Sequence, residues 1–463
     1  MQEPKIEVRD RSFAFKLLLS DANLFQGIAW LFIQQVIVAG SIFFLAMAAV
    51  NIENPSLSRQ WLIAFIVFMV LPYLPGILAN RKIDHWYLSS IRKFHFHAAD
   101  NHPFTPNHFP IKSLSDSRRS IYASSAPDVI GEFCHYIMAL VSSSLSAILV
   151  LIVVAGFVDL LLVVTYILSF CFCLIFVHYF GGVAASAANR KEDERVSLAA
   201  FGFSLWPNLV IGNETSKSNW RAGLDKRYLA YGREFNRNVY IQSLSQFVIS
   251  VLALLPTAIL LVWLAVTSAN DLAAFATLLA VAPRVFQILL ALHDLTTTIY
   301  AWNQVKGRLV VLQDFFKAPT DPEFSQDLDR FNLFEITATS REAISEPLDR
   351  ILSKEHGRVQ VSGPNGSGKT TFLLDLKKES AEASFYLPSQ SDLLFDGVAL
   401  SGSTGQIKIS EIDCISRMKP LPKIVLLDEW DANLDRENMD IVDKKITDLS
   451  IKTLIVEVRH FKE

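Results

Sequence analysis

The sequence predicts two domains of different fold class, an α-helical membrane domain followed by an α/β domain built on a parallel sheet. Hydrophobic residues make up 51% of the 463 residues and charged residues only 19%, and the long apolar runs lie before about residue 310. Beyond that point, short β-rich runs alternate with helical stretches, a pattern typical of a parallel sheet flanked by helices. We therefore place the domains at residues 1–318 and 328–463.

Six segments of the first domain are apolar over the roughly 20 residues that a helix needs to cross about 30 Å of hydrocarbon. They are residues 25–50, 61–80, 130–156, 159–183, 240–267 and 272–293. The sixth is the least regular, because it contains Pro283, Arg284 and His293. The sequence therefore predicts six transmembrane helices.

The two longest connections between these segments are strongly basic. The loop at residues 81–129 contains seven Lys and Arg residues and the loop at 187–238 contains nine, whereas the other connections contain only Arg59. Because Lys and Arg accumulate on the cytoplasmic side, we expect both loops and both termini in the cytoplasm. The helical periodicity of each loop is broken near its middle, at residues 103–112 and 206–214, which predicts long cytoplasmic helical extensions that turn back at these tips.

Four polar residues lie within the apolar segments, where exposure to lipid is unfavourable. They are Gln34, Gln35, Arg284 and His293. We expect their side chains to face a cavity or one another. For Gln34, Gln35 and Arg284, contact with a substrate and hydrogen bonding between helices are equally good explanations.

The cysteine and histidine patterns do not favour a disulfide framework or a metal site. The four cysteines lie in apolar segments or in the second domain, a distribution that indicates neither disulfides nor zinc. Four histidines, His95, His97, His102 and His108, cluster in the first loop. They could bind a metal, but without a helical ligand pair and a carboxylate we favour a polar loop tip. The net charge of −3 does not indicate a nucleic-acid partner.

A phosphate-binding motif opens the second domain. The segment GPNGSGKT matches G-x-x-x-x-G-K-[ST] and lies between a predicted strand and a predicted helix, as the motif requires. The backbone N–H groups of such a loop surround phosphates, the Lys369 ammonium reaches the β- and γ-phosphates, and the Thr370 hydroxyl can bind Mg²⁺. The predicted residues of this ATP and Mg²⁺ site are Gly363, Pro364, Asn365, Gly366, Ser367, Gly368, Lys369, Thr370 and Thr371.

The segment KIVLLDEW is an apolar strand that ends in two acidic residues. We expect Asp428 to hold the water shell of Mg²⁺ and Glu429 to polarise an attacking water, a division of roles that suits phosphoryl transfer.

With these motifs in this order, the second domain resembles an ATP-binding-cassette (ABC) ATPase, and the whole chain looks like an ABC exporter half-transporter. Gln390 in LPSQSDLLFDG matches the family's Q-loop, DANLD matches its D-loop and ends at Asp435, and His460 stands where the switch histidine does. The resemblance implies a homodimer in the inner (plasma) membrane that hydrolyses ATP and exports its substrate. It implies catalytic roles for Lys369, Gln390, Glu429 and His460, and Mg²⁺ contacts from Thr370, Gln390 and Asp428.

The family's signature loop, which caps the γ-phosphate bound by the partner subunit, corresponds to part of LSGSTGQIKIS. The following stretch IKISEIDCISRM has helical periodicity, so the capping residues should directly precede it. This favours Ser403, Thr404, Gly405 and Gln406, with residues 400–403 as the alternative register. STGQ, and Trp430 in DEW, are also similar to exporters associated with cyclic and siderophore peptides, which makes a small peptide the first expected substrate and a lipid or drug-like amphiphile the second.

Two features depart from the family pattern. The loop follows Gln390 after only ten residues, where the family has a multi-helix subdomain, so we expect a reduced helical subdomain. The stretch between Ile336 and His356 contains no aromatic residue to stack on adenine, which leaves Phe334 as the nearest candidate. These departures keep open a second function class, a nucleotide-gated membrane receptor or scaffold without useful turnover. An importer subunit is a weaker third alternative.

Overall fold

The computed structural model describes residues 18–51, 54–155, 160–267, 272–320, 332–336, 341–343, 354–395, 398–399 and 401–459. The chain forms two compact units. The first comprises Met1–Pro103 and Ser113–Lys317, and the second comprises Phe104–Lys112 and Ala318–Glu463.

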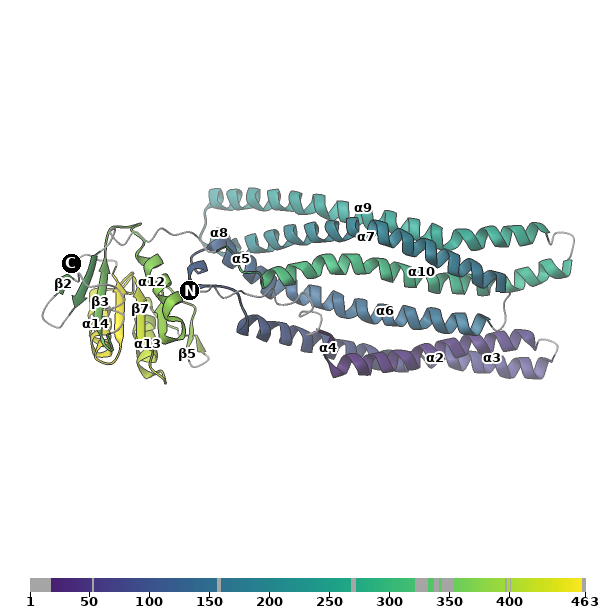
Figure 1. Ribbon diagram of the computed structural model, residues 1–463, viewed down its shortest axis with the longest axis horizontal. Helices are drawn as coiled ribbons and strands as arrows, with labels where there is room; N and C mark the ends of the chain where they lie inside the picture. Colours follow the sequence, from purple (N-terminus) through teal and green to yellow (C-terminus); the bar gives the residue numbers. More distant parts are fainter. Residues whose placement is uncertain are drawn as a thin grey trace, which may run out of the picture. The chain divides into compact units, whose positions relative to one another are not determined.

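The first unit is entirely helical in its described part. Its elements are α2 (Ala22–Val50), α3 (Pro55–Val70), α4 (Tyr73–Asp100), α5 (Lys112–Ser120), the π-helix η2 (Ile121–Ser125), α6 (Ala126–Ala155), α7 (Leu160–Gly202), α8 (Leu205–Val210), α9 (Glu214–Thr267) and α10 (Leu272–Phe315). The long helices run lengthwise beside one another, with α7 packed against α9 and α10 (Figure 1). The predicted breaks near residues 103–112 and 206–214 separate α4 from α5 and α7 from α9.

Five helical stretches among the described residues are long and apolar enough to cross a membrane. They are Ala22–Leu45, Pro55–Asp100, Lys112–Leu149, Val164–Gly202 and Glu214–Thr267. The sixth predicted span falls at the start of α10, where the side chains of residues 272–288 lie outside the described part. The structure therefore supports a multi-pass helical membrane domain, and the number six stays a prediction.

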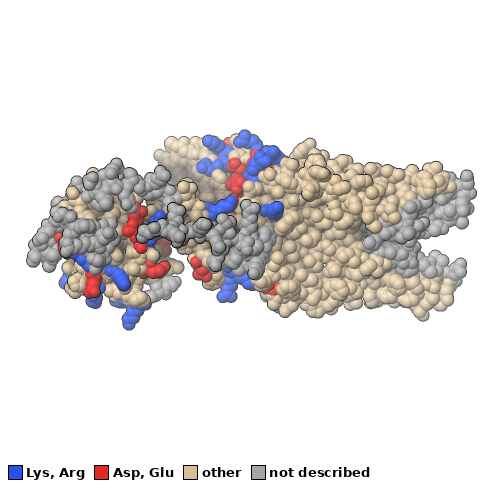
Figure 2. All heavy atoms as spheres, in the orientation of Figure 1, with Lys and Arg blue, Asp and Glu red and all other residues tan. Residues whose placement is uncertain are grey.

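Several helices are much longer than a bilayer is thick. The 54 residues of α9 correspond to about 80 Å of helix at ~1.5 Å per residue, against about 30 Å of hydrocarbon. Figure 2 shows Lys and Arg side chains gathered toward one end of this unit, beside a long stretch of surface that carries almost none on the face shown. The predicted helical extensions beyond the spans are thus present.

The two glutamines of the first apolar helix, α2, each contact another helix. Gln35 on α2 donates from Nε2 to Ser142 Oγ on α6 at 3.0 Å. This contact is a hydrogen bond between helices, the second of the two explanations offered for this residue. The Gln34 amide packs against Gly76 of α4, where an added Cβ would lie 2.9 Å from Gln34 Nε2. For Arg284, the side chain lies outside the described part.

A buried carboxylate joins three helices of this unit. Glu192 on α7 is fully buried; its Oε1 lies 2.7 Å from Arg195 Nη2, and its Oε2 lies 3.2 Å from Arg308 Nε on α10. Each arginine also pairs with an acid on α6, Arg195 with Asp128 and Arg308 with Glu132. Because a buried charge is tolerated only when it is paired and hydrogen-bonded, this network holds α6, α7 and α10 together.

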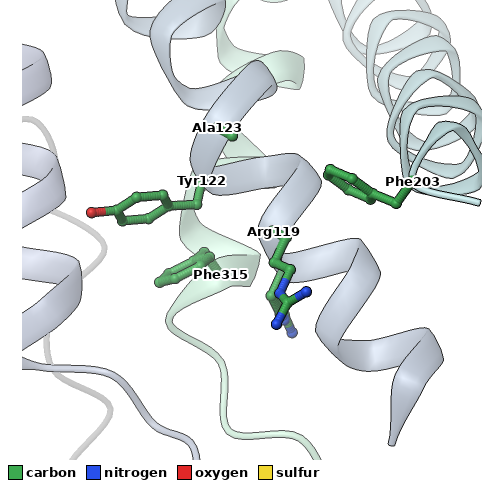
Figure 3. Close-up of a pocket in the computed structure, with 6 residues that line it drawn as sticks. Arg119, Tyr122, Ala123, Phe203 and Phe315 are labelled. Carbon is green, nitrogen blue, oxygen red and sulfur yellow. The ribbon is translucent and has the colours of Figure 1, made fainter. Parts of the chain in front are cut away.

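An open hollow of about 440 Å³ lies on the same unit, between α5, η2, α7 and α10. Its lining residues are Arg118, Arg119, Tyr122, Ala123, Phe203 and Phe315. In Figure 3 the Tyr122 hydroxyl points away from Phe203, and the side chains do not converge on a common point. The Arg118 guanidinium donates to the Asp314 carbonyl at 2.6 Å. We assign no ligand to this hollow.

The second unit is an α/β domain with a six-stranded sheet. The strands are β1 (Asn332–Ile336), β2 (Arg341–Ala343), β3 (Gly357–Ser362), β4 (Ser384–Leu387), β7 (Ile424–Asp428) and β8 (Leu454–Val458), in the order β2-β1-β3-β8-β7-β4. The strands β3, β8, β7 and β4 are parallel, and β1 and β2 are antiparallel additions at one edge. The sheet thus agrees with the strand and helix alternation predicted from the sequence.

Helices cover both faces of this sheet. The core on one face includes side chains of α12 (Lys369–Ser380), and the core on the other includes side chains of α13 (Thr404–Arg417) and α14 (Arg436–Ser450). Alternation along β7 separates the two cores, because Leu426 packs in the first and Leu427 in the second. The unit also contains the short helices η1 (Pro106–His108) and η4 (Ala381–Ala383) and the hairpin of β5 (Leu394–Phe395) and β6 (Val398–Ala399).

Replacing Glu192 by Ala is expected to destabilise the helical unit, because Arg195 and Arg308 lose their buried acceptor. We expect a loss of about 3 kcal/mol in the free energy of unfolding, the lower end of the range for a broken buried ion pair, since both arginines keep a second partner. Denaturant unfolding in detergent micelles measures this change. The Glu194→Ala variant, two residues away on α7 and less buried, is the control; an equal loss in both would contradict a specific role for the network.

Candidate nucleotide-binding site

Parallel pairing brings the predicted motifs to one edge of the sheet. β3 ends directly before the phosphate loop at residues 363–370, β7 ends at Asp428, and β4 ends three residues before Gln390. Because the carboxyl ends of parallel strands lie at one edge, these segments form a common site, as is usual for ligands of α/β sheets. The predicted switch residue His460 lies outside the described residues.

The phosphate loop has the backbone that anion binding requires. Gly366 and Gly368 have φ angles of 78° and 94°, a region that other residues rarely adopt, and a Cβ at either position would meet no atom within 4 Å. Gly368 precedes the first residue of α12, and no side chain caps that end of the helix. Its N–H groups therefore remain available for a phosphate.

Side chains of the same loop are arranged around this opening. Lys369 Nζ donates to the carbonyls of Gly363 at 2.9 Å and Pro364 at 3.0 Å, so the ammonium lies over the loop. The buried Ser367 Oγ has no hydrogen-bond partner among the described residues. Pro364 and Asn365 are exposed, and Thr370 and Thr371 lie in the first turn of α12. An anion bound within the loop would accept hydrogen bonds from the loop's backbone N–H groups and from the Ser367 hydroxyl.

A hydroxyl and a carboxylate meet at the position predicted for Mg²⁺. Thr370 Oγ1 lies 3.3 Å from Asp428 Oδ1, and Asp428 is only 6% exposed. Burial raises the pKa of Asp428, while hydrogen bonds from Tyr386 and Thr370 act in the opposite direction. Oxygen donors of this kind are those that Mg²⁺ prefers, so the residues fit the ion. Gln390, the third predicted contact, is exposed after β4.

Tyr386 is a site residue that the sequence analysis did not identify. Its hydroxyl donates to Asp428 Oδ2 at 2.8 Å, leaving Oδ1 toward Thr370. Burial and the adjacent carboxylate raise the pKa of this phenol, so it remains a neutral donor. The contact depends on the register of β4 and β7, in which Tyr386 pairs with Leu426. An aromatic residue in a strand carries no sequence pattern that reveals such a partner.

The predicted base Glu429 follows β7 in an unusual backbone conformation. Its φ angle is 45°, which is uncommon for a residue with a side chain. The next residue, Trp430, is fully buried, and its Nε1 donates to Glu457 Oε2 on β8 at 2.7 Å. Arg358 also donates to Glu457 through two nitrogens, at 3.0 and 2.9 Å. Trp430 and Glu457 therefore hold the turn that presents Glu429.

The predicted signature residues form the start of α13 instead of preceding it. Ser403 is the N-cap, and its hydroxyl accepts from Gln406 N at 3.4 Å while Gln406 Oε1 accepts from Ser403 N at 3.2 Å. This capping box starts the helix at Thr404, so Thr404, Gly405 and Gln406 are its first turn. The expectation that all four residues lie before the helix was wrong, because local capping extends it. In the alternative register, Leu400 lies outside the described residues.

Asp435 and Phe334, two further residues of the sequence analysis, lie in the second unit. Asp435 is the N-cap of α14 and accepts from Asn438 N at 2.8 Å, and Phe334 is a partly buried residue of β1. Among the described residues, no group of three or more His, Cys, Asp or Glu side chains could hold a metal ion. His95 instead contacts the Tyr122 carbonyl at 3.1 Å, and His108 accepts from Thr105 N at 3.0 Å.

The first loop tip is part of the same compact unit as the site. Asn107 Nδ2 donates to Asp375 Oδ1 on α12 at 2.7 Å, and the ring of Phe109 lies 6.1 Å from that of Tyr386, edge to face. This tip therefore contacts both the helix that follows the phosphate loop and the residue that holds Asp428.

Comparison with known proteins defines the fold. No protein-family model matches the sequence, and no curated protein matches it. Among solved structures, the chain is similar to a bacterial Atm1-family ABC exporter with ATP bound, with a TM-score of 0.61 and 12% sequence identity over 98% of this chain and 92% of that one. At this identity the similarity shows the fold alone. The chain has the fold of an ABC exporter, a helical membrane domain and an α/β domain, and nothing in the match supports the peptide-exporter subtype.

Replacing Tyr386 by Phe is expected to weaken divalent-metal binding. The variant keeps the ring but loses the hydrogen bond that orients Asp428, a charge-assisted contact whose loss removes about 1.5 kcal/mol, or roughly tenfold in affinity. Electron paramagnetic resonance of Mn²⁺ bound with ATP measures the affinity directly. Binding of ATP without metal should be unchanged; an unaltered Mn²⁺ affinity would contradict the orienting role.

Proposed function

We propose that this chain is an ATP-driven ABC exporter half-transporter that works as a homodimer in the inner (plasma) membrane. One observation carries the proposal: a phosphate loop, the contact of Thr370 with the buried Asp428, and Glu429 share one sheet edge in a chain whose other unit has membrane-length apolar helices. The exporter fold of the structural neighbour supports it. We expect both termini and both long loops in the cytoplasm, because the two loops are rich in Lys and Arg.

In the proposed dimer, each ATP lies between the phosphate loop of one chain and the start of α13 of the other. The loop N–H groups and Lys369 bind the β- and γ-phosphates. The N-terminal turn of α13, with Ser403, Thr404, Gly405 and Gln406, supplies further donors to the γ-phosphate from the opposite side. Because only the γ-phosphate touches both chains, ATP closes the dimer and hydrolysis reopens it.

The hydrolytic step is assigned to the turn after β7. Glu429 accepts a hydrogen bond from the attacking water and orients it toward the γ-phosphorus, and the bond to the leaving ADP oxygen breaks in line. Mg²⁺, held through Thr370, Asp428 and Gln390, would neutralise charge on the phosphate oxygens. His460 is proposed to contact the γ-phosphate and Asp435 to lie in the loop that meets the partner chain.

We propose that closure of the dimer changes the side to which a central pathway is open, from the cytoplasm to the outside. Closure of the dimer is transmitted through the loop tips at residues 103–112 and 206–214. The first tip is supported by the contacts of Asn107 and Phe109 within the second unit. Rigid-body motion of packed elements is one way in which such closure can reach a distant site.

For the substrate we propose a small peptide or amphiphilic natural product. This part of the proposal rests on the similarity of STGQ and DEW to peptide exporters, with a lipid or drug-like amphiphile as the next class. Uptake of fluorescent cyclic peptides into inside-out vesicles, in the presence of ATP, tests it against a fluorescent lipid.

A second function class is favoured by one observation. Between Gln390 and α13 the described residues contain only the short strands β5 and β6, where the family has a helical subdomain. A nucleotide-gated receptor or scaffold would need ATP binding without fast turnover, so hydrolysis measurements separate the two functions.

The Glu429→Gln variant is expected to bind ATP but to lose turnover by at least about 10²-fold, because the amide cannot accept the proton of the water. ATP hydrolysis and nucleotide binding by purified protein in lipid nanodiscs measure both effects. Equal turnover in the two proteins would remove Glu429 from this role, and tight binding without turnover in both would favour the receptor.

A bulky charge at Ser403 is expected to block dimer closure more than the same charge at Ser401. Ser403→Arg removes the N-cap of α13 and fills the proposed phosphate-capping position, whereas Ser401→Arg lies on the exposed loop before it. ATP-dependent dimerisation of the Glu429→Gln protein, followed by crosslinking, measures closure. The reverse ranking would favour the register at residues 400–403.

A further inference from the structure

The short connection between Gln390 and α13 leaves the proposed signature helix without the subdomain that carries it in the family. Only β5, β6 and short loops lie between them in the described residues. Other contacts must therefore connect α13 to the segment that contains Gln390. A buried ion pair on α13 makes two such contacts.

Lys408 and Glu411 lie one turn apart on α13 and are 3% and 2% exposed. Lys408 Nζ is 2.8 Å from Glu411 Oε2. Removing two charges from water is unfavourable unless further polar contacts compensate. A buried pair of this kind is therefore expected to have additional polar partners.

Both side chains reach the segment that contains Gln390. Lys408 Nζ donates to the Pro388 carbonyl at 3.2 Å, and Ser391 Oγ donates to Glu411 Oε1 at 2.5 Å. The two contacts lie on either side of Gln390, which is itself exposed. The backbone around Gln390 is thus attached to α13 at two points, while the Gln390 side chain remains accessible.

The same helix carries the proposed signature residues at its N-terminal end. Ser403 caps α13 five residues before Lys408, and the buried side chains of Ile412 and Ile415 hold the helix in the core that includes Trp430. An α-helix is stiff over this distance, so a displacement of the segment at residues 388–391 must move the N-terminus of α13 as well.

We propose that Lys408 and Glu411 are positioning residues that transmit the state of a chain's own ATP site to the site of its partner. The inference rests on the proposed function, in which Gln390 senses the nucleotide of its own chain and the start of α13 caps that of the other. In the family, a helical subdomain connects the Q-loop to the signature helix. Here the ion pair would make this connection directly. Its specific consequence is cooperativity between the two sites of the dimer.

The principal variant replaces both residues together, Lys408→Met and Glu411→Met. Apolar groups of similar volume often replace a buried ion pair without loss of stability, whereas a single replacement would leave an unpaired charge. The matched control removes the ion pair between Asp413 and Lys445, which joins α13 to α14 at 2.5 Å but is about one-third exposed and does not contact residues 388–391. In that control Asp413 becomes Asn and Lys445 becomes Met.

ATP hydrolysis in nanodiscs, measured as a function of ATP concentration, and binding of a fluorescent ATP analogue are the two measurements. We expect the Hill coefficient to fall from about 2 toward 1 and turnover to fall at least about fivefold in the principal variant, with analogue affinity unchanged. The control variant should behave as wild type. A merely structural pair would instead lower thermal stability and leave the Hill coefficient unaltered.

A second series avoids dependence on the folding of the double variant. Ser391→Ala removes one of the two contacts and should lower the Hill coefficient partially, and Ser391→Thr, which keeps the hydroxyl, should restore it. Wild-type cooperativity in Ser391→Ala and in a folded double variant would overturn the inference, as would a Hill coefficient of about 1 in the wild type. In both cases the proposed function would stand, whereas a wild type that does not hydrolyse ATP would remove that function and the inference with it.

Discussion

Parallel pairing of four strands is the constraint on which the candidate site depends. In the register of the sheet, Val458 lies opposite both Val361 and Asp428, and Leu387 lies opposite Leu427. The loops that follow all four strands therefore begin at the same edge, and each chemical group needs only a few residues to reach the site. An antiparallel strand has its carboxyl end at the opposite edge, as β1 does beside β3, and β1 carries none of the residues of the phosphate loop or of the Thr370 and Asp428 pair.

Buried carboxylates mark the places where elements must keep a fixed relation. Glu192 joins three helices of the membrane domain, Glu457 holds Arg358 and Trp430, and Glu411 attaches α13 to Ser391. Each has a hydrogen-bond donor or a charged partner at more than one position, which compensates for the loss of hydration. A multiply bonded carboxylate also specifies orientation, a property that apolar packing provides less strictly.

The reduced connection between Gln390 and α13 changes how movement can pass through this fold. A multi-helix subdomain can rotate as a separate body, whereas the contacts of Lys408 and Glu411 attach α13 directly to the strand edge. At the same edge of the sheet, the ring of Phe109 contacts that of Tyr386, and the Tyr386 hydroxyl donates to Asp428. The first loop tip is therefore connected to Asp428 through one intervening residue, Tyr386.

The sequence by itself determined the features that depend on local pattern. Apolar length predicted the membrane helices, alternation predicted the parallel sheet, and glycine spacing predicted the phosphate loop, because each follows from backbone geometry within one segment. Tertiary structure decided the contacts of Tyr386 with Asp428 and of Trp430 with Glu457, which join residues 42 and 27 positions apart. Those contacts depend on which strands pair and in which register, and a strand's own residues do not reveal its neighbour. The start of α13, by contrast, is local: the reciprocal contacts of Ser403 and Gln406 form a capping box, so the four residues read as a loop begin the helix.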